Sequence, residues 1–133
     1  MDPRIERAQQ LYWEITRLTD LGAHRKRRSK MIEMAQIHEG RAVELLAERD
    51  PDGWVDLFAA ITAWAKAGCR EDVGRLVAAG RSAASQSGSG DAEIREQLDE
   101  LEDWADDLTM TIVPSLRDYD RRLPSLRLEA ALA

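Results

Sequence analysis

The sequence predicts an all-α fold, a single antiparallel bundle of about five helices, helical-repeat-like, with a short C-terminal tail. Apolar residues recur at three- and four-residue spacing along most of the chain, which is the spacing of one helix face. Gly and Pro turns separate the segments that carry this spacing. The length of 133 residues fits one domain that buries roughly two-thirds of its unfolded surface. We therefore expect a helical domain over 1–112 and a tail over 113–133.

The first helix is expected at about 3–21. Pro3 suits the first turn of a helix, where its missing N–H costs nothing, and Asp2 precedes it as an N-cap. Gly22 is placed to end this helix, because glycine readily adopts the left-handed conformation of a helix C-terminus.

The second helix is expected at about 29–49, with Ser29 as its cap. The polar, basic stretch 24–30 before it forms either a connector or the first turns of that helix. The Asp-Pro-Asp-Gly sequence at 50–53 predicts a turn that ends the second helix.

Two shorter helices are expected at about 54–67 and 70–84, joined by a turn at 68–70 that makes them antiparallel neighbours. Trp54 and Trp64 lie on the wide apolar face of the first of these and are expected in the core. Four small residues in the second would allow close approach of another helix: Gly74, Ala78, Ala79 and Gly80.

The fifth helix, expected at about 91–112, has the strongest periodic signal in the chain. Its apolar residues alternate at four- and three-residue spacing, as in a helix packed lengthwise against a bundle. SQSGSG at 85–90 has the composition of a flexible linker. Pro114 and a second proline in the tail predict an extended or turning segment after the helix.

Composition and motifs exclude several classes of function. No apolar run reaches the roughly 20 residues of a membrane span, and the N-terminus lacks a signal-peptide core, so we expect a cytoplasmic protein. Cys69 is the only cysteine, so no internal disulfide is expected. His24 and His38 form no metal-binding spacing, and His38 is interpreted as a hydrogen-bonded core histidine beside Glu39. No motif of a catalytic or nucleotide-binding site is present, so we expect no catalytic residues, cofactor or metal.

Residues 91–112 contain nine Asp or Glu and one Arg, a larger imbalance than the net charge of −6 for the whole chain. Any electrostatic preference for a partner should therefore begin in this segment. The residues expected to bind a partner are Asp99, Glu102, Asp103, Asp106 and Asp107.

A basic cluster in the N-terminal third supports a rival hypothesis. Its members are Arg25, Lys26, Arg27, Arg28 and Lys30. Such a cluster suits phosphate contacts in a nucleic-acid-binding subunit if its side chains share one exposed surface. The cluster would also suit pairing with the acidic fifth helix, within one chain or between chains.

A second rival concerns the tail, which repeats Pro-Ser-Leu-Arg at 114–117 and 124–127. This repeat suits a docking peptide that attaches the helical domain to a larger assembly.

Residues 57–84 resemble a helical hairpin of the tetratricopeptide-repeat family. The matching positions are Trp64, Ala67-Gly68 at the turn, Glu71-Asp72-Val73, Leu76-Val77 and Gly80. Val73 and Gly80 stand where the family has small alanines. The end of the second helix, Arg41 to Leu46 followed by Asp50-Pro51, is similar to the close of such a repeat. The resemblance implies neighbouring hairpins and partner recognition on a helical surface, with no catalytic residues.

These observations together predict a non-catalytic protein-interaction or adaptor module that uses the acidic helix, the tail or both. The expected partner is another protein, and self-association through the fifth helix stays open. Nucleic acid is the less favoured partner, and no membrane contact is expected.

Overall fold

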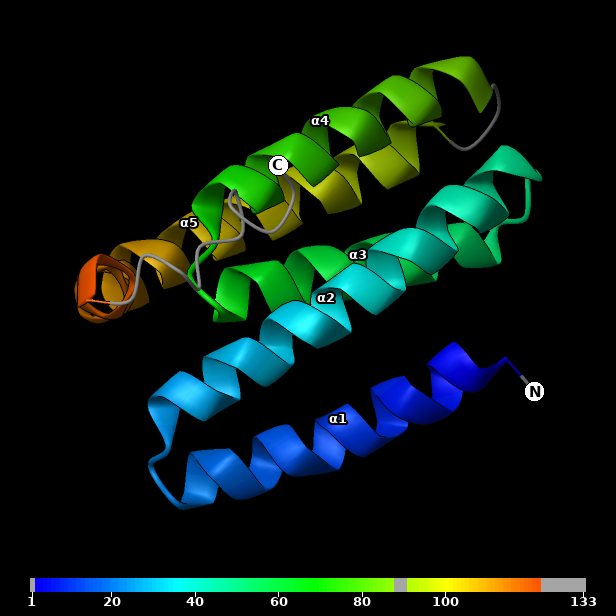
Figure 1. Cartoon of the computed structure of the whole chain (residues 1–133). Helices are drawn as coiled ribbons and strands as arrows, with labels where there is room; N and C mark the ends of the chain where they lie inside the picture. Colours follow the sequence, from blue (N-terminus) through cyan, green and yellow to red (C-terminus); the bar gives the residue numbers. More distant parts are fainter. Residues whose placement is uncertain (1, 88–90, 123–133) are drawn as a thin grey trace.

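The computed structural model describes residues 2–87 and 91–122, and every regular element in these ranges is an α-helix (Figure 1). The elements are α1 (Pro3–Asp20), α2 (His24–Ala47), α3 (Asp52–Lys66), α4 (Arg70–Ser87) and α5 (Asp91–Arg122). This arrangement confirms the all-α bundle. None of the described helices is both long and apolar enough to span a membrane.

Consecutive helices run antiparallel, and α3 is the central element (Figure 1). It packs against α2, α4 and α5, whereas α1 packs mainly on α2. The main core contains Leu57, Ile61 and Trp64 of α3, with Val77 of α4 and Leu98 of α5. The expectation that Trp64 lies in the core is confirmed, and Trp54 is half-buried against the same cluster.

The breaks at the ends of α1, α2 and α3 share one backbone arrangement. After α1, the N–H of Ala23 donates to the carbonyl of Leu18, and Gly22 has φ +67°. The end of α3 repeats the pattern at Gly68, with φ +77°. Such Schellman motifs satisfy the last carbonyls of a helix and reverse the chain within a few residues. The predicted turns at Gly22 and Gly68 are therefore confirmed.

Two glycines allow helices to approach closely. A Cβ on Gly53 would lie 2.7 Å from Cγ of Leu46 and 2.9 Å from the backbone N of Leu46, so α2 and α3 meet at this point without room for a side chain. A Cβ on Gly80 would lie 3.0 Å from Leu57 and 3.1 Å from Leu98. Of the four small residues expected to allow close approach, Gly80 does so, and the other three face solvent.

Two predicted helix starts were wrong. The second helix begins at His24, which confirms the alternative in which 24–30 forms its first turns. The start expected at 29 is wrong, because Ser29 lies inside the helix and the cap position Ala23 makes no side-chain hydrogen bond. The motif at Gly22 turns the chain directly into the next helix, and Arg and Lys have high helix propensity, so a polar stretch is not necessarily a loop. The third helix begins at Asp52, with Gly53 in its first turn.

Two predicted boundaries near the C-terminus also differ. Residues 85–87 of the expected linker belong to α4, where the Ser85 hydroxyl donates to the carbonyl of Arg81 at 3.0 Å. Residues 88–90 lie outside the described part. The fifth helix continues through Pro114 to Arg122, because proline removes one backbone donor while the following residues include good helix formers. Residues 123–133 of the expected tail lie outside the description.

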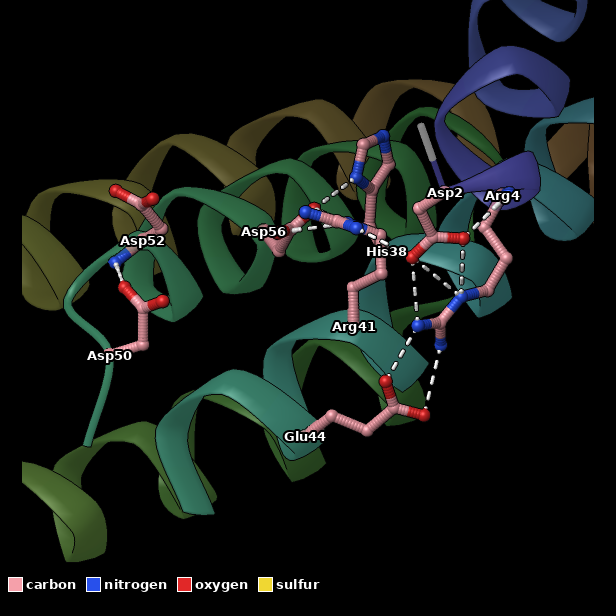
Figure 2. Close-up of polar contacts among 8 residues, drawn as sticks. All are labelled: Asp2, Arg4, His38, Arg41, Glu44, Asp50, Asp52 and Asp56. Carbon is pink, nitrogen blue, oxygen red and sulfur yellow. Dashed lines mark hydrogen bonds and ion pairs between the residues drawn. The ribbon is translucent and has the colours of Figure 1, made fainter. Parts of the chain in front are cut away.

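Ion pairs attach α1 to α2 (Figure 2). The carboxylate of Asp2 caps α1 by accepting from the backbone N–H of Arg4 at 2.9 Å, which confirms the predicted N-cap. Asp2 also accepts from Arg41 of α2 at 2.8 Å, and Arg4 reaches Glu44 of α2 at 2.6 Å. Hydrogen bonds from Arg4 lower the pKa of Asp2 to about 2.

Alanine substitutions at Gly53 and Gly74 should change the free energy of unfolding in opposite directions. Gly53→Ala should lower the free energy of unfolding by about 1–3 kcal/mol, because the new methyl group overlaps Leu46. Gly74→Ala should raise it by up to about 1 kcal/mol, because alanine favours the helix and nothing lies within 4 Å of the added Cβ. Urea unfolding of both variants measures the difference, and equal effects would contradict the close approach of α2 and α3.

The hydrogen bonds of Asp2 with Arg4 and Arg41 predict a loss of stability in acid. Because the folded-state pKa of Asp2 is about 2 and the ordinary pKa of an aspartate is 3.8, the contribution of Asp2 to stability is present above pH 3.8 and is lost as the pH falls toward 2. The melting temperature of Asp2→Asn should be lower than that of the wild type at neutral pH and should change less between pH 4 and pH 2. Asp20→Asn is the control, because Asp20 is exposed and has no side-chain partner in the described ranges. Identical pH profiles for wild type and Asp2→Asn would contradict the assignment.

Candidate interaction surfaces

One side of α5 is occupied by contacts with α4. Arg81 binds Asp99 at 2.5 Å and Glu102 at 2.9 Å, and Arg70 lies 3.7 Å from Asp106. Three of the five acidic residues proposed from sequence thus pair with arginines of α4. The sequence could not show this division, because it depends on which helix packs beside α5.

The solvent side of α5 carries a different set of carboxylates, spaced alternately three and four residues apart. We define the acidic stripe as Glu93, Glu96, Glu100, Asp103 and Asp107, all of which are exposed. Two of these, Asp103 and Asp107, were proposed from sequence. Within the described ranges, Glu100 and Asp103 make no hydrogen bond or ion pair.

A shallow pocket of about 480 Å³ lies beside the acidic stripe, between α3 and α5. It is lined by Phe58, Gln97, Glu100, Leu101 and Trp104. The Trp104 side chain remains 40% exposed although Phe58 and Leu101 are half-buried. The sequence pattern alone does not decide whether Trp104 lies in the core or at the surface. Trp104 stands in the sequence between the exposed Asp103 and the buried Ala105. This position places it at the edge between the buried and the solvent side of α5.

The basic cluster does not form one free surface. Arg27 donates to the hydroxyl of Thr19 at 2.7 Å, Arg28 donates to the carbonyl of Ala67 at 2.9 Å, and Lys30 lies 3.5 Å from Glu14. Arg25 and Lys26 are exposed. The basic cluster lies on the first turns of α2. Arg27 and Lys30 contact α1, and Arg28 contacts the end of α3. On α5, Asp99, Glu102 and Asp106 pair with arginines of α4.

His38 lies at the centre of a polar group between α2 and α3 (Figure 2). Its Nδ1 is 2.8 Å from Oδ1 of Asp56, and Nε of Arg41 donates to the same carboxylate at 3.3 Å. Asp56 is only 8% exposed. His38 is therefore hydrogen-bonded, as predicted, but its partner is Asp56, whereas Glu39 binds Trp64 and Arg75.

Sequence analysis missed Asp56. The available signal was its place on the apolar face of α3, one turn from Gly53 and from Ala60, where an acidic residue needs a partner. The arrangement fixes the carboxylate of Asp56 between His38 and Arg41. In the part of the chain that the structure describes, no three His, Cys, Asp or Glu side chains come together as a metal site.

Comparison with known proteins adds no family assignment: no family model, curated protein or solved structure matches this chain.

Proposed function

We propose that the protein is a non-catalytic protein-interaction module whose α5 face binds a basic segment of another protein. The observation that carries the proposal is the exposed Trp104, which borders an apolar pocket. It lies beside Glu100 and Asp103, which make no hydrogen bond or ion pair in the described part of the chain. Aromatic residues with one accessible face are frequent anchors of protein interfaces.

The acidic stripe defines the charge of the partner. Asp107 lies 14 positions after Glu93, so the acidic stripe is about 21 Å long at 1.5 Å per residue. Exposed like charges along this length repel one another at low salt, and a basic partner relieves that repulsion. Such complementarity chiefly raises the association rate and the specificity.

Trp104 and its pocket define the rest of the partner. Phe58 and Leu101 offer apolar contacts, and the indole face of Trp104 suits an arginine or lysine by cation–π attraction. A helix with apolar side chains on one face and Lys or Arg beside them matches both features. We therefore propose an amphipathic basic helix as the partner segment.

The other two hypotheses have less support. Nucleic-acid binding through the basic cluster needs cations that are free on one surface, and three of the five are engaged within the chain. Docking through the tail depends mainly on residues beyond 122, which lie outside the described part.

A matched pair of tryptophan variants tests the proposal. The probe is a synthetic amphipathic helix of about 14 residues with leucines on one face and lysines and arginines beside them. Trp104→Ala should weaken its binding at least about tenfold, as loss of an anchor does. Trp13→Ala should leave it unchanged, because Trp13 is 69% exposed on α1, away from the acidic stripe. Isothermal titration calorimetry gives both affinities.

Charge reversal provides a second measurement on the same complex. Glu100→Lys with Asp103→Lys should weaken peptide binding and flatten its dependence on salt. Equal affinities for the two tryptophan variants, or a peptide affinity that the double charge reversal does not change, would contradict the proposal.

A further inference from the structure

A groove of about 610 Å³ lies between α1 and α3, with α2 as its floor. This groove is separate from the α5 surface, so an inference about it goes beyond the proposed function. Its floor includes His38 and Arg41, and its walls are largely apolar. In Figure 1, α1 and α3 both run antiparallel to α2 and therefore parallel to each other.

Both walls of the groove have the spacing of a helix seam. On α3 the lining residues include Asp52, Val55, Ala59, Ala63 and Lys66, at intervals of three or four. The wall on α1 has the same spacing from Ile5 through Ala8 to Tyr12. Such stripes are typical of helices that pack lengthwise against a further helix.

The apolar groups at the rims have no cover within the described chain. Val55 is 69% exposed and Tyr12 is 59% exposed. The opposite face of α3, which includes Leu57 and Trp64, is fully buried in the core. A helix that is apolar on both faces is usually enclosed on both sides. The groove face of α3 therefore has the character of an interface.

The stripe on α3 is complementary to itself. When a second α3 lies antiparallel with Ala59 opposite Ala59, Asp52 faces Lys66. The exposed Val55 then lies over the helix position of Ala63, whose small side chain is buried in its own chain and leaves room above it. Both end charges are exposed, and neither side chain has a partner in the described ranges. In a dimer with a two-fold axis, the pair of Asp52 and Lys66 therefore forms twice, once at each end of the interface. A helix from an unrelated protein would not require this symmetry.

We propose that a second copy of this chain occupies the groove, with the two α3 helices antiparallel about a two-fold axis at Ala59. Alanine at the axis permits the shortest interhelical distances, about 8 Å. The buried carboxylate of Asp56 already binds His38 and Arg41, so covering it leaves that anion paired.

Charge exchange tests the symmetry directly. Sedimentation equilibrium of the full chain should show a dimer that dissociates on dilution. Asp52→Lys and Lys66→Asp should each raise the dissociation constant about tenfold or more, because each places like charges at both ends. The double variant Asp52→Lys with Lys66→Asp should restore the wild-type value, because the opposite charges face each other again. Asp20→Lys, outside the groove, should leave the constant unchanged.

A blocking variant completes the test. Ala59→Glu should yield a monomer, since it places two carboxylates at the axis, and circular dichroism should confirm that the variant keeps its helical content. A wild-type chain that is monomeric at all concentrations would overturn the proposal. Failure of the double variant to restore dimerisation would overturn the antiparallel pairing. Binding of the basic peptide at α5 is independent of these outcomes.

Discussion

The fold depends on the packing of α3 against α2. The two helices approach so closely at Gly53 that a Cβ there would overlap the side chain and backbone of Leu46. This contact fixes the register of α2 on α3, and the remaining helices attach to one of these two. α1 packs on α2, whereas α4 and α5 pack on α3. A disturbance between α2 and α3 therefore reaches both the α5 surface and the α1–α3 groove.

Carboxylates beneath the surface define how α2 lies against its neighbours. Asp56 joins α3 to α2 through His38 and Arg41, and Glu39 joins α2 to α3 through Trp64 and to α4 through Arg75. Burial raises the pKa of Glu39, but hydrogen bonds from Arg75 and Trp64 outweigh it, so the pKa lies below the ordinary value. A paired buried anion disfavours other registers, because any shift would leave it without its partners.

The sequence predicted the features that depend on local chemistry. Helix ends were identified from Gly22, Gly68 and Asp2. The left-handed conformation of glycine and the capping hydrogen bond of aspartate both depend only on residues within one helical turn. Long-range pairing was not predictable, since the choice of Arg81 for Asp99 depends on the neighbour of α5. The sequence left the basic start of α2 open between a connector and helical turns. The continuation past Pro114 was not predicted, because proline was given more weight than helix propensity. Asp56 was overlooked although an acidic residue on an apolar stripe is visible in the sequence.

The two proposed surfaces have a joint consequence. In a dimer formed through α3, the two-fold axis relates two copies of the α5 face, each with its own Trp104 and acidic stripe. α5 packs on the core side of α3, and the groove lies between α1 and another face of the same helix. Dimerisation therefore need not consume the α5 surface. A partner with two basic segments would bind the second face at a raised effective concentration, provided that its linker spans the distance between the faces. Under the proposed function, modest affinity at each face would then suffice for firm binding of a bivalent partner.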